Sequence, residues 1–231
     1  MICVNCKYEH EYDYCSNCGQ KAAVPKITFK SILTDAFSMI TNMDRGILYN
    51  IKSLILNPGI IVNDYINGKR RPIFNPVSFL IISTTLYLLA NSYIDRDNTS
   101  VEIKSSVYSI GYEAGRFIKG NFKYFWIFSI FWLGLSTKML FGKYNYVEHL
   151  VISAFVIGLS TLLSIIGLVL FKLNLIFNPI MYIFITWMTY NIFKANRKRI
   201  DIFLLSLAST ILFFINLLIV TFVIGVCKHY L

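Results

Sequence analysis

The chain has 231 residues, of which 56% are hydrophobic and only 15% are charged, and its mean hydropathy is +0.59. A soluble domain carries about 25% charged residues, so this composition excludes both a soluble globular enzyme and a disordered chain. The formal net charge of +10 suits a membrane protein whose Lys and Arg residues collect in cytoplasmic loops. We therefore predict an all-α polytopic membrane protein.

Four of the five cysteines lie in the first eighteen residues, as two Cys-x-x-Cys pairs separated by eight residues. Each pair is typical of a tight turn that directs two thiolates to one point, and two such turns make a four-thiolate zinc site. The alternatives are two disulfides, which need an oxidising compartment, and a redox motif, which needs a thioredoxin-like pattern that is absent. We predict a structural zinc ribbon over residues 1–20, with the ligands Cys3, Cys6, Cys15 and Cys18.

Three further expectations concern the cysteine-rich head and the last cysteine. Residues 7–14 are expected to form a small hairpin, and His10 is expected to be exposed on it rather than bound to the metal. Gly19 follows the second cysteine pair, where the chain must turn sharply. Cys227 is expected to be a small buried hydrophobic residue.

Residues 21–73 predict amphipathic helices over 27–40, 47–56 and 60–66, because apolar residues recur there at helical intervals. They are too short and too polar to cross a bilayer. Either they lie in the membrane interface or they pack on the membrane domain, and the sequence does not separate these alternatives.

A basic cluster follows these helices and precedes the first long apolar segment. At about 1 kcal/mol for each basic residue near an anionic surface, it is expected to contact lipid headgroups. Nucleic-acid binding is not favoured, because no aromatic residues alternate with the basic ones. The predicted membrane-surface residues are Lys69, Arg70 and Arg71.

Residues 74–231 predict a transmembrane domain with about five crossings, because five apolar segments approach the twenty residues that a helix needs to span a bilayer. The second and fourth are short and rich in Trp, Tyr and Phe, which suit an interface as well as a full crossing. A long external loop is expected over 95–123. The predicted segments are 76–94, 124–141, 147–171, 175–193 and 202–226.

The distribution of positive charge predicts the orientation. With the cysteine-rich head inside and five crossings, 15 of the 22 Lys and Arg residues lie on the inner side, as the positive-inside rule requires. The amino terminus is then cytoplasmic and the carboxyl terminus lies outside. A reducing compartment also favours zinc thiolates over disulfides.

No catalytic set is recognisable in the sequence, but a few polar residues lie at or within the apolar segments. Lys138 is expected to extend to the headgroups, and Glu148 and His149 are expected to face solvent, although a carboxylate beside a histidine could also move protons. An Asn-Pro pair interrupts the fourth segment and either is satisfied by neighbours or lines a polar cavity. The candidate polar intramembrane site therefore consists of Lys138, Glu148, Asn178 and Pro179.

Several motifs in the first ninety residues carry a resemblance. They are Cys15-Ser-Asn-Cys18-Gly19-Gln20, Leu56-Asn57-Pro58-Gly59, Asp64-Tyr65-Ile66-Asn67-Gly68-Lys69-Arg70 and Phe74-Asn75-Pro76-Val77-Ser78-Phe79-Leu80. In these motifs the chain resembles an uncharacterised bacterial family of small integral-membrane proteins with a zinc-ribbon head. The layout is also similar to that of the Yip-type five-helix membrane proteins, which are linked with membrane trafficking. Neither resemblance supplies catalytic residues.

The sequence thus predicts a non-enzymatic protein of the bacterial inner membrane whose zinc ribbon recruits or positions a protein partner. A small transporter or channel around Asn178 and Pro179 is the alternative, and a lipid-handling enzyme is a third reading that lacks an acid–base pair. The expected partners are anionic lipids, a protein at the ribbon and a second copy of the chain.

Overall fold

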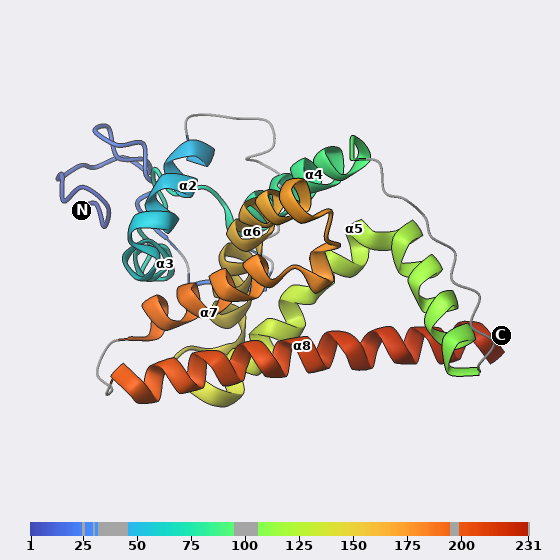
Figure 1. Ribbon diagram of the computed structural model, residues 1–231. Helices are drawn as coiled ribbons and strands as arrows, with labels where there is room; N and C mark the ends of the chain where they lie inside the picture. Colours follow the sequence, from blue (N-terminus) through green and yellow to red (C-terminus); the bar gives the residue numbers. More distant parts are fainter. Residues whose placement is uncertain (25, 30, 32–45, 95–105, 195–198, 231) are drawn as a thin grey trace.

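The computed structural model describes residues 1–24, 26–29, 31, 46–94, 106–194 and 199–230. A small cysteine-rich head, residues 1–24, lies beside two short helices at one end of a bundle of longer helices (Figure 1). Most of the amphipathic helix expected over 27–40 lies outside the described residues.

The two short helices next to the head are α2 (Gly46–Leu56) and α3 (Pro58–Ile66). The turn predicted at Asn57-Pro58-Gly59 separates them, because Pro58 lacks an N–H and starts α3 at its first position. The two helices match the segments predicted over 47–56 and 60–66. α3 packs on the bundle, where the Tyr65 ring lies edge-on to Phe155 with 5.5 Å between the ring centroids.

The next two helices are α4 (Pro76–Ser92) and α5 (Ser106–Phe141). Asn75 begins α4, because its side chain accepts hydrogen bonds from the N–H groups of Val77 and Ser78 while Pro76 occupies the first turn. α5 is bent at Asn121, whose backbone leaves the helical region (φ −116°, ψ 21°). Residues 106–123 are helical, so the loop expected over 95–123 is wrong for this part.

Helix α6 (Tyr146–Phe171) is the centre of the bundle and contacts α3, α4, α5 and α7. It begins with a capping box, in which the Asn145 side chain accepts from the Glu148 N–H and the Glu148 carboxylate accepts from the Asn145 N–H. Its glycines allow close packing, since a Cβ at Gly158 would lie 2.8 Å from the Phe79 ring of α4. In its most apolar window, 61% of α6 is buried inside the protein.

The last elements are a short 3-10 turn, η1 (Leu175–Phe177), and the helices α7 (Pro179–Phe193) and α8 (Arg199–Tyr230). α8 runs the length of the bundle along α5 (Figure 1). It also contacts α7, where the Thr186 hydroxyl donates to Thr210 Oγ1 at 3.0 Å.

The prediction of five crossings is not supported. Three helices of the described chain are long and apolar enough to cross a membrane, namely Gly120–Phe141 within α5, Tyr146–Phe171 and Arg199–Cys227. They coincide with the predicted segments 124–141, 147–171 and 202–226. α4 has 17 residues and α7 has 15, so at 1.5 Å per residue they are about 26 Å and about 23 Å long, short of a hydrocarbon core of about 30 Å.

The physical cause of the shortfall differs between the two helices. The predicted segment 175–193 is divided at Asn178, where η1 ends and Pro179 starts a new helix. The predicted segment 76–94 ends early, because the last helical residue is Ser92. The likeness to the five-helix Yip-type layout depended on five crossings and is therefore not supported either.

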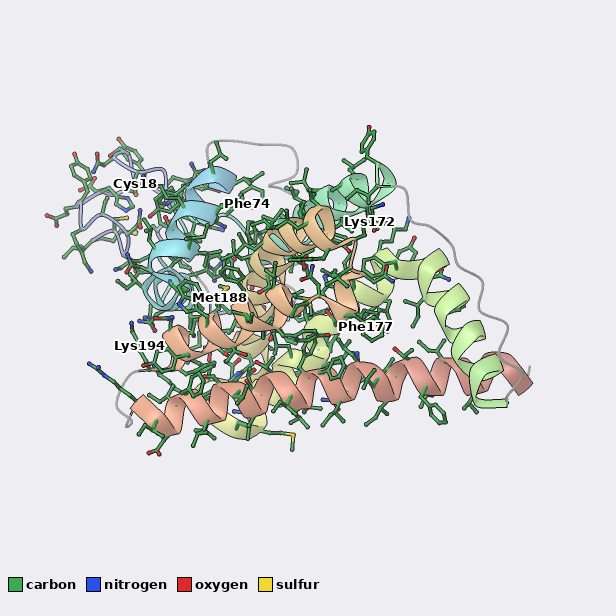
Figure 2. All side chains as sticks on the ribbon, in the orientation of Figure 1. Cys18, Phe74, Lys172, Phe177, Met188 and Lys194 are labelled. Carbon is green, nitrogen blue, oxygen red and sulfur yellow. The ribbon has the colours of Figure 1, made fainter. Side chains whose placement is uncertain are left out.

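The two ends of the bundle can be distinguished by side-chain contacts. Asn178 Nδ2 donates to the Ser164 carbonyl late in α6, whereas Phe193 stacks on His149 early in α6, so α7 runs antiparallel to α6. The turn over 142–145 reaches α3, because the Tyr144 hydroxyl donates to Asn63 Oδ1 at 3.2 Å. We call this the head end and the opposite end the far end; Lys194 and Lys172 mark them in Figure 2.

Candidate metal centre

Each cysteine pair of the head forms the same hydrogen-bonded turn. The N–H of Lys7 donates to the Cys3 carbonyl at 3.0 Å, and the N–H of Gly19 donates to the Cys15 carbonyl at 2.8 Å. Both donors have positive φ, 64° for Lys7 and 68° for Gly19, a conformation that glycine adopts without steric cost. Isolated β-bridges close the turns, Ile2 with Glu9 and Tyr14 with Lys21.

These turns bring the four predicted ligands together. The Sγ atoms of Cys3, Cys6, Cys15 and Cys18 all lie within 4.8 Å of one another. The shortest separations join the two turns, 3.6 Å from Cys3 to Cys18 and 3.5 Å from Cys6 to Cys15. A tetrahedron of thiolates with metal–sulfur bonds of about 2.3 Å has edges of about 3.8 Å. The cluster could therefore hold one metal ion.

The sulfur atoms are not paired as disulfides. All four cysteines are free, and 3.5 Å is far longer than the bond of about 2.05 Å in a disulfide. Cys3 and Cys15 are buried, whereas Cys6 and Cys18 are half-buried.

Cys18 has an unusually acidic thiol. Burial acts to raise its pKa, but hydrogen bonds with the Asn5 side chain, the Gln20 backbone and the neighbouring thiols together lower the pKa from 9.0 to about 6. Because a metal binds the thiolate, this ligand is already in the binding form at neutral pH.

Several expectations about residues near the head and at the last helix are wrong. His10 is buried, at 6% exposure, and its ring nitrogens have no hydrogen-bond partner among the described residues. The hairpin expected over 7–14 is absent, because each β-bridge instead encloses one cysteine pair. Cys227 is exposed rather than buried, since it lies on the outer surface of α8.

The head is attached to the bundle through Gln20, whose side chain is 3% exposed. Its Nε2 donates to the Gly68 carbonyl at 3.0 Å, and its Oε1 accepts from the Arg70 N–H at 3.3 Å. Gln20, two residues after the second cysteine pair, is thus fixed to the segment that joins α3 to α4. Asn50 of α2 fixes the other end of this segment, because its amide bonds to both the N–H and the carbonyl of Phe74.

The basic cluster lies in the segment that Gln20 holds. Lys69 forms an ion pair with Asp64 at 2.9 Å, and the Arg70 guanidinium lies 5.7 Å from the centroid of the Tyr65 ring. Arg71 is exposed and its guanidinium lies over Gly19, because a Cβ on that glycine would be 3.7 Å from Arg71 Nη1. Lys69 and Arg70 therefore contact protein groups, and Arg71 lies close to Gly19. Their predicted contact with lipid headgroups stays a prediction.

The four predicted intramembrane polar residues lie in two separate places. Lys138 and Glu148 are at the head end, where Lys138 Nζ donates to the Tyr144 carbonyl at 2.6 Å and Glu148 caps α6. Asn178 and Pro179 are near the far end, where the Asn178 amide accepts from the Ile180 N–H and donates to the Ser164 carbonyl. Glu148 and Ser164 are sixteen residues apart on α6, about 24 Å along the axis.

His149 does not face solvent as expected; it is fully buried. Its Nδ1 lies 2.9 Å from Thr137 Oγ1, and its ring stacks on Phe193 with 5.7 Å between centroids. The Thr137 hydroxyl also lies within hydrogen-bonding distance of the Leu133 and Gly134 carbonyls of α5, so it links the His149 ring to the backbone of that helix. Nε2 has no hydrogen-bond partner among the described residues.

Sequence reasoning assigned no structural role to Gln20 or Asn50, and it placed His149 in solvent. Each acts on residues distant in the chain, and no local motif marks such pairings. The Asn-Pro pairs at 75–76 and 178–179 are different, because a cap residue followed by proline is a local sign of a helix start.

Residues 44–88 match the model of a family described as "Protein of unknown function (DUF3667)". The match covers α2, α3 and most of α4, and so includes both segment ends held by Gln20 and Asn50. No curated protein and no solved structure matches the chain.

Proposed function

We propose that this chain is a non-enzymatic protein of the bacterial inner membrane whose cytoplasmic head binds one structural zinc ion and recruits a protein partner. Three helices long and apolar enough to span a bilayer support the membrane assignment. The four clustered thiols support the metal, and a four-thiolate tetrahedron is a common form of structural zinc site.

The observation that carries the recruitment role is the surface of the head. Three aromatic side chains of the head are exposed. Tyr12 is 75% exposed, and Tyr8 and Tyr14 are exposed as well. Tyrosines are enriched at protein interfaces, since they bury a large area with few rotatable bonds. Gln20 holds this surface at a fixed place on the bundle, as a positioning role requires.

The arrangement of basic residues supports a cytoplasmic head. Lys69, Arg70, Lys143 and Lys194 all lie with α3 at the head end, where Tyr144 contacts Asn63 and α7 ends. Positive residues accumulate on the cytoplasmic side of membrane proteins. The cytoplasm also keeps thiols reduced and available to zinc.

The experiment that tests the proposal places a photo-crosslinking amino acid at Tyr12 in cells, with a second one at Phe128 on the exposed surface of α5 as the control. We expect a discrete protein adduct from position 12 and not from position 128. Cys15→Ser should remove zinc, measured by elemental analysis, and should remove the adduct while leaving membrane insertion intact.

The matched control for the cysteine change is Cys227→Ser, which alters an exposed thiol away from the head. It should retain both zinc and the adduct. An adduct that persists in Cys15→Ser protein without zinc would contradict the proposed role of the metal. Absence of any adduct at position 12 would contradict recruitment through this surface.

A further inference from the structure

A polar cavity of about 420 Å³ lies at the head end, between the start of α3, the α5–α6 turn and the end of α7. The elements are held close together, because a Cβ at Gly59 would lie 2.5 Å from the Asn191 carbonyl oxygen. The wall residues that matter for binding are Leu56, Ile60, Asp64, Lys143, Tyr144 and Lys194.

Two cations in this wall lack a carboxylate partner. Among the described residues, neither Lys143 nor Lys194 is in an ion pair. Lys143 Nζ lies 4.8 Å from the centroid of the Tyr144 ring, and Lys194 Nζ donates to Asn191 Oδ1 at 3.2 Å. The carboxylate of Asp64 is engaged by Lys69 at 2.9 Å. The cavity therefore carries net positive charge and suits an anion.

The lining of the same cavity also includes apolar residues. Leu56 and Ile60 line it and are exposed, and Leu48, which is 78% exposed, lies eight residues before Leu56 on α2. A soluble phosphate ion makes no favourable contact with these apolar side chains. A molecule with an anionic group joined to hydrocarbon chains can contact both the lysines and the apolar residues.

The position of the cavity favours a membrane lipid as this molecule. Lys143 belongs to the turn between α5 and α6, where two helices long enough to cross a bilayer end and begin. The residues that flank a spanning helix lie at the level of the lipid headgroups. A phosphodiester at this level is within reach of lysine side chains, which attract anionic lipid.

We propose that this cavity binds an anionic phospholipid, with Lys143 and Lys194 contacting the phosphate and the acyl chains lying along Leu48, Leu56 and Ile60. The site is separate from the cysteine-rich head and does not depend on whether the head recruits a partner.

The test uses the full chain in a mild detergent, incubated with equal amounts of phosphatidylglycerol and phosphatidylcholine and examined by native mass spectrometry. We expect the wild-type protein to retain phosphatidylglycerol preferentially. In the double variant Lys143→Gln/Lys194→Gln, affinity for phosphatidylglycerol should fall roughly thirty-fold, because each basic residue near an anionic headgroup contributes a factor of about five.

The matched control is Lys123→Gln/Lys172→Gln, which removes the same charge from two exposed lysines toward the far end. In Figure 2, Lys172 is widely separated from Lys194. The control variant should retain phosphatidylglycerol as the wild type does. Equal loss in both double variants would show attraction to overall charge and would overturn the proposal, as would full retention by Lys143→Gln/Lys194→Gln.

Two further arms separate a lipid from free phosphate. An excess of inorganic phosphate should leave phosphatidylglycerol bound. Displacement of phosphatidylglycerol by phosphate would assign the cavity to a soluble anion and would overturn the proposal of a lipid site. Leu48→Ser/Leu56→Ser should weaken retention of phosphatidylglycerol while both lysines remain, and unchanged retention would overturn the proposed acyl path.

Discussion

Gln20 and Gly68, forty-eight positions apart in the chain, are joined by a buried hydrogen bond of 3.0 Å from the Gln20 side-chain amide to the Gly68 carbonyl. Gln20 lies two residues after the last cysteine of the four-cysteine cluster, and Gly68 lies just before the basic cluster. The Gln20 side chain therefore couples the conformation of the head to the position of the basic residues.

The first prediction concerns that coupling. Gln20→Ala removes both hydrogen bonds and leaves the Gly68 carbonyl and the Arg70 N–H without this partner, at a cost of about 1–3 kcal/mol for each buried group. Hydrogen exchange of the Arg70 amide, measured by mass spectrometry on residues 66–72, should accelerate while zinc content is unchanged. The exposed neighbour Lys21, changed to Ala, is the control and should leave the exchange as it is. Unaltered exchange in Gln20→Ala would refute the coupling.

The second prediction concerns the Cys18 thiol, whose pKa is lowered to about 6. In metal-free protein, the thiol is protonated and unreactive below this pH and is a reactive thiolate above it. Alkylation of Cys18, followed by peptide mass spectrometry, should therefore rise with a midpoint near pH 6. Metal affinity should fall as the pH drops through the same value, because protons then compete for the ligand.

Asn5→Ala removes a hydrogen bond that lowers the Cys18 pKa. The midpoint of alkylation should move to higher pH in this variant. A midpoint that stays where it is in the wild type would mean that Asn5 does not stabilise the thiolate.

The third prediction concerns packing between α4 and α6. Gly158→Ala should destabilise the protein by about 1–3 kcal/mol, because the new methyl group would lie 2.8 Å from the Phe79 ring. Thermal unfolding in detergent measures the loss, and Phe79→Leu in the same protein should recover part of it. Gly111→Ala is the control, since among the described residues a Cβ there has no neighbour within 4 Å beyond the adjacent backbone of its own helix. Equal melting temperatures for the two alanine variants would contradict the close contact.

The fourth prediction separates a structural role of Asn178 from a transport role. Asn178→Leu removes the cap of α7 and the hydrogen bond to α6, so the melting temperature should fall by the equivalent of about 1–3 kcal/mol. Asn178→Asp retains the cap acceptor, so its melting temperature should lie between those of the wild type and Asn178→Leu. If wild-type proteoliposomes show solute flux that Asn178→Leu abolishes without a change in melting, the transporter alternative is favoured instead.

The features that sequence predicted best are those encoded within a few residues. The spacing of Cys3, Cys6, Cys15 and Cys18 predicted the cluster, because each turn depends only on its own hydrogen bonds. Hydropathy likewise predicted the three long apolar helices. It overestimated the segment 175–193, because average hydropathy is insensitive to the cap and proline at Asn178-Pro179 that start a new helix. It also placed the end of the segment 76–94 two residues beyond Ser92, where α4 ends.

Pairings between distant segments could not be predicted in this way. The burial of His149 depends on Thr137 and Phe193, which come from two other helices. The cavity at the head end combines residues from α2, α3, the α5–α6 turn and α7. The lysines in its wall look like ordinary loop residues until the fold brings them together.

The low burial of α8 affects which amino-acid substitutions this helix can tolerate. Only 22% of its most apolar window is buried inside the protein, against 61% for α6. Lipid chains adapt to the shape of a side chain, whereas a packed neighbour does not. The identity of most apolar residues in α8 is therefore weakly constrained, and exchanges among Leu, Ile, Val and Phe should be tolerated. In α6 the same exchanges meet fixed neighbours, so shape rather than hydropathy limits what that helix accepts.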